Sequence, residues 1–204
     1  MPRKSRLAPR KSPLQDRSAA TVAAILEAAA RVLERRGLDA LTTNRVAEAA
    51  GVSIGSLYQY FPNKDAIVAA LIRAAHESLR DDIVAVVADA APFEDRLDRL
   101  IAAAVRHQLA RPTLARILDV EEARLPVEPL TRAAIADMRH ALVRVFSEQV
   151  AVNAIEQTIA DVMAIARGLI DAAGQRGESD APALRRRVFA AVMGYLKESG
   201  ALTA

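Results

Sequence analysis

The sequence predicts an all-α protein, with an N-terminal domain of three helices followed by a larger helical domain. Hydrophobic residues make up 52% of the 204 positions, and Ala, Leu, Arg and Glu, which favour helices, are abundant. Apolar residues recur at intervals of three and four in most segments, and no segment shows the sustained alternation of a strand. Glycines and prolines separate the periodic segments, as they do at helix ends.

The first long helix is expected over residues 17–36. Val22, Ile25, Ala29 and Leu33 recur at helical spacing, and Gly37 follows as a C-cap. Its apolar face should support the helices that come next.

Residues 42–64 read as two short helices joined by a tight turn. Thr42 or Thr43 can cap the first helix, and Gly51 permits the sharp turn after it. Ser53 can cap a second helix, which Pro62 stops. This is the spacing of a helix-turn-helix, whose second helix can enter the major groove of DNA. The alternative is an ordinary helical hairpin that buries Leu57, Tyr60 and Phe61.

The outward positions of the second helix suit contact with DNA. They are small, polar or aromatic, and none is acidic: Ile54, Gly55, Ser56, Tyr58, Gln59 and Tyr60. Of the seven aromatic residues in the chain, three lie within residues 58–61.

The string AEAAGVSIGSLYQYFPNKDAIVAAL resembles the DNA-binding segment of the tetracycline-repressor (TetR) family of bacterial regulators. The resemblance covers about residues 17–71 and rests on the pattern AGVS-x-G-x-LY-x-YF-x-x-K. It implies that Tyr58 and Lys64 contact the DNA backbone. Asn44 departs from the common family pattern, and it could bond a phosphate or a base edge. The candidate DNA-binding residues are Thr43, Asn44, Ser53, Ile54, Gly55, Ser56, Tyr58, Gln59, Tyr60 and Lys64.

Residues 64–204 are expected to form the second domain, for which the resemblance implies effector binding and dimerisation. Helices are expected at about residues 64–90, between Pro92 and Pro112, and at 113–123, 130–150, 154–173 and 183–198. The DNA-binding domain is expected over residues 17–63. Residues 1–16, which carry five Lys/Arg and three prolines, are expected to be a disordered arm. This arm would either follow the DNA or remain a solvated tail.

The last two helices show adjacent apolar seams, which favour a homodimer interface. The alternative is packing within one chain. The candidate interface residues are Ile159, Val162, Leu169, Val188, Val192 and Tyr195.

A small-molecule effector, implied by the resemblance, would bind in a cavity between helices of the second domain. Each candidate lining residue could instead be ordinary core. The candidates are His107, Leu118, Met138, Leu142, Phe146 and Met163.

Charge is divided unevenly along the chain. Residues 1–64 hold 11 Lys/Arg and 5 Asp/Glu, whereas residues 65–204 hold 17 and 20. Attraction for phosphate should therefore concentrate in the first part. The sequence has no cysteine, no secretory signal and no apolar run near the ~20 residues of a membrane span, so we expect a cytoplasmic protein.

No pattern indicates an enzyme, a cofactor or a metal site. The sequence lacks a Gly-rich phosphate loop, HExxH and GxSxG, and its three histidines are scattered. The sequence thus predicts a dimeric repressor that a small-molecule effector releases from a palindromic DNA operator. Two rivals are a small-molecule binding protein with a vestigial helix-turn-helix and an enzyme on a helical scaffold.

Overall fold

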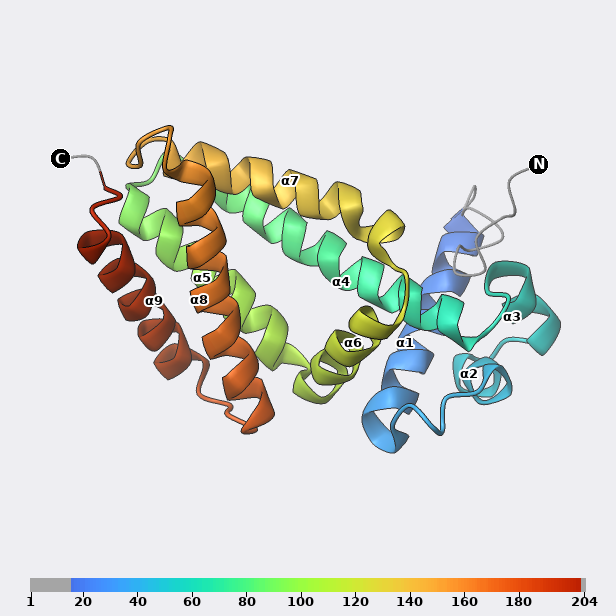
Figure 1. Ribbon diagram of the computed structural model, residues 1–204. Coiled ribbons are helices and arrows are strands. Elements are labelled where there is room, and N and C mark those ends of the chain that lie inside the picture. Colours follow the sequence, from blue (N-terminus) through green and yellow to red (C-terminus); the bar gives the residue numbers. More distant parts are fainter. Residues whose placement is uncertain (1–15, 203–204) are drawn as a thin grey trace. The chain divides into compact units, whose positions relative to one another are not determined.

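The computed structural model describes residues 16–202, which form helices joined by short loops (Figure 1). Within these residues there are nine helices and no strand, apart from one isolated bridge between Val150 and Leu202. The all-α prediction is therefore confirmed. The helices are α1 (Asp16–Arg36), α2 (Thr43–Ala50), α3 (Ile54–Tyr60), α4 (Lys64–Val87), α5 (Phe93–Ala110), α6 (Pro112–Arg124), α7 (Glu128–Phe146), α8 (Ile155–Gln175) and α9 (Ala181–Glu198). Residues 1–15, most of the expected arm, lie outside the described part of the chain.

Helix ends follow the expected capping chemistry. Gly37 has φ 73° after α1, and its N–H donates to the Leu33 carbonyl at 2.9 Å. The Asn63 side chain accepts from the Ala66 N–H at 2.8 Å at the start of α4. Helix α6 begins one residue before its predicted start, and helix α7 begins two residues before its own. Pro112 and Pro129 fit there because the first turn of a helix does not use the backbone N–H that proline lacks.

The chain divides into two compact units, each made of two separate stretches. Unit 1 comprises the residues up to Ala75 together with Thr113–Thr131, and unit 2 comprises His76–Pro112 and the residues from Arg132 onward. The sequence-based boundary at residues 63/64 therefore falls inside unit 1. Helix α4 contributes its first half to unit 1 and its second half to unit 2, and nearly all of α6 belongs to unit 1.

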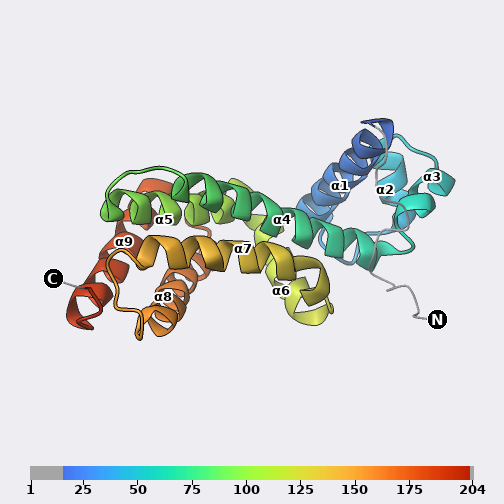
Figure 2. The same cartoon turned by 90° about the horizontal axis from the view of Figure 1, so that it is seen from above.

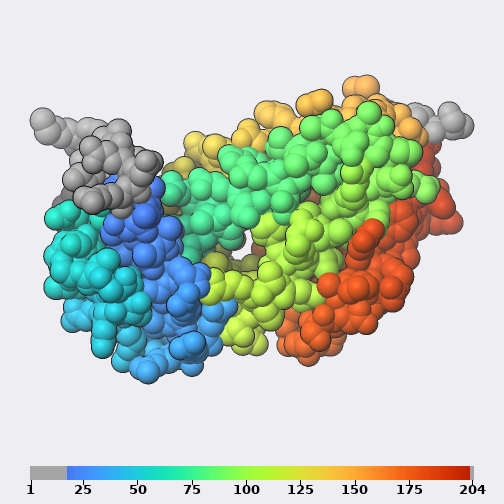
Figure 3. Space-filling view, turned by 180° about the vertical axis from the view of Figure 1, so that it is seen from behind, coloured from blue at the N-terminus to red at the C-terminus, as the bar shows by residue number. Residues whose placement is uncertain are grey.

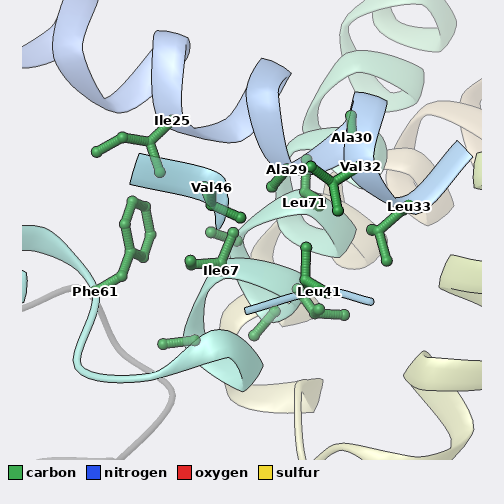
Figure 4. Packing of buried hydrophobic residues seen from close by; sticks show 14 of the residues in the cluster. Ile25, Ala29, Ala30, Val32, Leu33, Leu41, Val46, Phe61, Ile67 and Leu71 are labelled. Carbon is green, nitrogen blue, oxygen red and sulfur yellow. The ribbon is translucent and has the colours of Figure 1, made fainter. Parts of the chain in front are cut away.

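The core of unit 1 is a single apolar cluster (Figure 4). Ile25 and Leu33 of α1 meet Val46 of α2, Phe61 after α3 and Ile67 of α4, and all five are fully buried. Helix α6 and the loop after it add Leu114, Leu118, Leu125 and Val127 to the same cluster. This burial explains why α6, although distant in sequence, joins the unit that contains α2 and α3.

Unit 2 is built on α5, α8 and α9, which pack against one another. Figure 3 shows one face of this unit, where α5 lies beside α9. The second half of α4 and most of α7 complete the unit, and the two helices run alongside each other in Figures 1 and 2. Phe93 and Phe146 meet edge to face in its core, with ring centroids 5.5 Å apart.

Arg124 at the end of α6 pairs with a buried carboxylate of its own helix and also reaches the first turn of α4 within unit 1. The Glu121 side chain is only 3% exposed, and its Oε2 accepts from Arg124 at 2.5 Å and 2.8 Å. The same guanidinium reaches Asp65 Oδ1 at 3.1 Å. These carboxylates, Glu121 first, raise the pKa of Arg124 above its ordinary value. Arg124 thus neutralises a carboxylate that would otherwise be buried with its charge unpaired.

Arg124→Ala should therefore destabilise the protein by on the order of 3 kcal/mol, because Glu121 would stay buried without its cation. Urea denaturation followed by circular dichroism measures this loss. Arg31→Ala is the matched control, since Arg31 pairs with Glu27 on the exposed surface of α1 and such pairs contribute about 1 kcal/mol or less. Equal stability of the two variants would contradict the assigned role of Arg124.

Candidate nucleic-acid interface

The turn between α2 and α3 is fixed by two caps and one glycine. Thr42 Oγ1 accepts from the Arg45 N–H at 3.2 Å and so caps α2, which settles the choice between Thr42 and Thr43. Gly51 then adopts φ 67°, and its N–H donates to the Glu48 carbonyl at 3.1 Å. Nothing lies within 4 Å of the position a Cβ would take at Gly51. Glycine is favoured there by the left-handed backbone and not by crowding.

Helix α3 is short, and one buried leucine anchors it. Ser53 Oγ accepts from the Ser56 N–H at 3.0 Å, so Ser53 caps the helix as predicted. Leu57 is fully buried in the unit 1 core and fixes which face of α3 points outward. The predicted helix-turn-helix is present in the structure.

The outward face of α3 carries the predicted side chains. Gly55 and Gln59 are exposed, as are Ile54 at 38% and Tyr58 at 41%. Ser56 is half-buried, and its hydroxyl lies 2.8 Å from the Ser53 hydroxyl. No acidic residue lies in α3, so the face adds no repulsion toward phosphate.

Helix α2 is tied to α3 on the same surface. The hydroxyls of Thr43 and Tyr58 lie 3.1 Å apart and share a hydrogen bond. Asn44 is exposed next to Thr43. The bond holds Tyr58 in one orientation at the edge of α3, and it leaves the rest of the phenol accessible.

Lys64 opens α4 at the end of this segment. Its side chain is exposed, and it forms no ion pair with any described residue. The ammonium group is therefore available to an anion, next to the Asn63 cap that orients the first turn.

Tyr60 differs from its predicted role. It is only 8% exposed and belongs to the unit 1 core, because Leu57, Tyr60 and Phe61 share the inward side of the helix and its end. The hairpin alternative was therefore right about these three side chains, although the other face of α3 stays exposed. We leave Tyr60 out of the proposed surface.

The predicted effector residues do not gather at one site. Leu118 lies in the core of unit 1, whereas Met138, Leu142 and Phe146 contribute to the core of unit 2. Met163 is 48% exposed on α8. His107 Nε2 lies 3.2 Å from Asp82 Oδ2, where it helps to hold α5 against α4.

The predicted dimer seam is also corrected. Val188 and Val192 are fully buried, and Ile159 and Val162 are 3% and 7% exposed within the single chain. Leu169 and Tyr195 are half-buried against the same core, and the Tyr195 hydroxyl donates to Asp161 at 2.5 Å. The apolar seams of α8 and α9 face each other and α5, so the opposite faces of these helices are the ones that remain exposed.

Two adjoining surface pockets in unit 2 involve residues that sequence reasoning missed. The larger, about 590 Å³, lies between α4 and α7, and it is lined by Arg80, Asp81, Val84, Ala85, Val87, Ala88, Asp137, His140, Ala141 and Arg144. The smaller, about 250 Å³, shares Val87, Ala88 and Arg144 with it and adds Asp89, Ala90, Arg96 and Glu148. The only available signal was the spacing of Asp137, His140 and Arg144, which puts them on one helix face.

Within the smaller pocket, Arg96 is an almost buried cation. Its side chain is 7% exposed, and both terminal nitrogens donate to Glu148, one of them at 3.0 Å. Its Nε is buried and has no hydrogen-bond partner among the residues that the structure describes. Hydrogen bonding from Arg96 holds the pKa of Glu148 below its ordinary value, and the charge of Arg144 acts in the same direction.

Neither a membrane helix nor a metal cluster is found in the part of the chain that the structure describes. No helix there is both long and apolar enough to span a bilayer. No three His, Asp or Glu side chains among those residues are grouped so that they could hold a metal ion.

Geometry and sequence together define a helical protein with a helix-turn-helix. The profile of bacterial regulatory proteins of the tetR family matches residues 25–71. The transcriptional regulator BetI of Rhizobium meliloti is 38% identical over 93 residues, which are 45% of this chain and 46% of BetI. The regulator TtgR of Pseudomonas putida is 40% identical over 80 residues, 39% of this chain and 36% of TtgR. The helix-turn-helix segment of the chain, residues 25–71, is thus that of the TetR family of bacterial regulatory proteins.

Solved structures share the fold over most of the chain. FadR, the fatty acid degradation regulator of Bacillus halodurans, covers 86% of this chain and 96% of its own, with a TM-score of 0.71 and 19% identity. A TetR regulator from Rhodococcus covers 89% and 98%, with a TM-score of 0.63 and 21% identity. SmeT in complex with triclosan covers 84% and 90%, with a TM-score of 0.60 and 18% identity. In sequence, by contrast, the matches span less than half the length of BetI and of TtgR.

Proposed function

We propose that this protein is a sequence-specific DNA-binding transcriptional repressor that acts as a homodimer in the cytoplasm and leaves its operator when a small-molecule effector binds unit 2. The observation that most directly supports this proposal is the outward face of α3. This face is exposed and free of acidic residues, and the helix is capped at both ends. The curated relatives are transcriptional regulators, and one neighbour of the same fold was solved with a bound small molecule.

On this proposal, α3 enters the major groove, and the protein makes one kind of contact with the phosphate backbone and another with the bases. Tyr58 and Lys64 hold the phosphate backbone, which sets the position of the helix without reading sequence. Gln59 and Ser56 face the base edges, and Gln can pair with adenine through two hydrogen bonds. Thr43 supports Tyr58 through their shared hydrogen bond.

The dimer is proposed to form through the exposed faces of α8 and α9. On α8 these faces carry Ala160, Ala164 and Gly168 four residues apart, and on α9 they carry Ala190 and Gly194. Nothing lies within 4 Å of a Cβ placed at Gly168 or Gly194. Each glycine destabilises its helix by about 1 kcal/mol relative to alanine, and packing within the chain gives no reason for either. Small residues allow two helices to approach closely, which suits a second copy of the same pair around a two-fold axis.

A gel-shift titration with the DNA upstream of the protein's own gene tests the proposal as a whole. Wild type should bind one short palindromic segment far more tightly than unrelated DNA of equal length at physiological salt. Binding that is equal on all sequences, or absent at low salt, would reject the regulator and favour the vestigial helix-turn-helix.

Lys64→Ala should weaken binding to operator and unrelated DNA alike. Each phosphate contact releases about one counterion, so the slope of log K against log salt should become shallower by about one unit per half-site. Fluorescence anisotropy at several salt concentrations measures the slope. Arg139→Ala removes one positive charge from an exposed site on α7 and should leave the slope unchanged. An unaltered slope in Lys64→Ala would remove Lys64 from the interface.

Gln59→Ala should change base preference more than overall affinity. Loss of a two-bond contact should cost about 1–3 kcal/mol at one position in each half-site, and variants at that position should then bind almost equally. Competition binding against a set of single-base operator variants measures the preference. Gln175→Ala, at an exposed site on α8, is the control. Uniform weakening on every variant would place Gln59 on phosphate.

A double substitution, Ala164→Glu with Gly168→Glu, should produce folded monomers. Both positions are exposed, so the fold tolerates the carboxylates, whereas a two-fold interface would bring like charges together. Sedimentation velocity gives the oligomeric state, and Ala133→Glu on exposed α7 is the control. Glu at Val162 or Val188 cannot serve this purpose, because both side chains lie in the core of unit 2. A dimeric double variant would show that another surface joins the protomers.

A further inference from the structure

The groove between α4 and α7 in unit 2 has the size of a small-molecule site. Its volume of about 590 Å³ lies within the range of roughly 300–1,000 Å³ typical of ligand pockets. Beyond Arg80 and Asp81, the α4 wall is apolar, with Val84 and Ala85 about one turn before Ala88, and Val84 is 45% exposed although it is a large aliphatic residue. An apolar ligand body of a few carbons could cover this wall and remove it from water.

The charged groups around the groove are not evenly paired. Arg80 is held by Asp81 at 2.6 Å and lies 3.8 Å from Asp137, so its charge is satisfied. Arg144 is different: its side chain is exposed and has no ion pair or hydrogen bond with any described residue. It lines both pockets and therefore stands where they join.

The smaller pocket explains why Arg144 stays unpaired. Glu148 is the nearby carboxylate, but both of its oxygens are engaged by Arg96. Asp89 is engaged by Arg99 at 2.6 Å. Arg96 itself is nine-tenths buried and directs both terminal nitrogens at Glu148, so among the described residues Glu148 pairs with Arg96 and not with Arg144. The two pockets together are lined by three arginines and four carboxylates, and Arg144 is the one of these arginines that forms no ion pair with a described residue.

We infer that this groove binds an amphipathic monocarboxylate, with the carboxylate at Arg144 and the apolar chain along Val84, Ala85 and Ala88. A guanidinium matches a carboxylate through two parallel hydrogen bonds. A single negative charge fits better than a phosphate dianion, because Asp89, Asp137 and Glu148 also border the pockets. The role of this ligand as the effector rests on the proposed function, whereas its binding does not.

Calorimetric titration of the full-length protein with octanoate tests the site. Octanoate should bind wild type more tightly than octylamine does, because an ammonium group cannot pair with Arg144. Octyl phosphate should bind more weakly than octanoate. Arg144→Ala should lose roughly tenfold to a hundredfold in octanoate affinity, the range expected for hydrogen bonds to a charged group. Arg139→Ala is the matched control, since Arg139 lies on the same helix and pairs with Glu156.

The results separate this inference from the proposed function. Absence of octanoate binding to wild type, or equal binding by Arg144→Ala, overturns the site even if the protein binds its operator. Octanoate that binds through Arg144 and also releases wild type from operator DNA, but does not release Arg144→Ala, supports both the site and its role as effector site. Octanoate that binds through Arg144 and leaves the DNA complex unchanged supports the site and overturns its role in regulation.

Discussion

The proposed DNA-facing surface depends on one apolar core, because the helices that form it cannot be stable by themselves. Helices of eight and seven residues, the lengths of α2 and α3, are marginal in water even for sequences with high helix propensity. Val46 and Leu57 are fully buried, and each fixes the rotation of its helix against α1 and α4. The exposed positions of Tyr58 and Gln59 are therefore set by what lies on the opposite side of α3.

The same core extends the unit beyond the helix-turn-helix. Leu114, Leu118 and Leu125 close it from a stretch about fifty residues further along the chain. Arg124 adds a polar link to Asp65, which directly follows the proposed phosphate anchor Lys64. A displacement of α6 would therefore have to break an apolar contact and also the ion pair between Arg124 and Asp65, whereas Glu121 and Arg124 lie on the same helix and would move together.

Local structure was readable from the sequence because its signals are local. Capping by Ser53, the turn at Gly51 and the stop at Pro62 each involve residues within a few positions of one another, and the structure has all three. The orientation of the last two helices was not readable. Periodicity shows that Val188 and Val192 share a face, but it does not show whether that face meets the same chain or a second copy. The unpaired state of Arg144 was equally hidden, since it depends on Arg96 occupying Glu148 across 52 residues of sequence.

The residues that packing within the chain leaves unexplained are the best guide to what the protein binds. Gly51 is accounted for by its positive φ, and Gly174 has the Gln108 amide 3.0 Å from where a Cβ would stand. Gly168 and Gly194 have neither reason, because both lie within helices and face open space. Arg144 is a similar case among the charged residues, because Glu148 and Asp89 beside it already pair with other arginines. A chain selected only for folding would gain stability from alanine at both glycines. The two glycines on one surface, and an arginine without an ion pair beside a groove on another, both argue for contacts made outside the single chain.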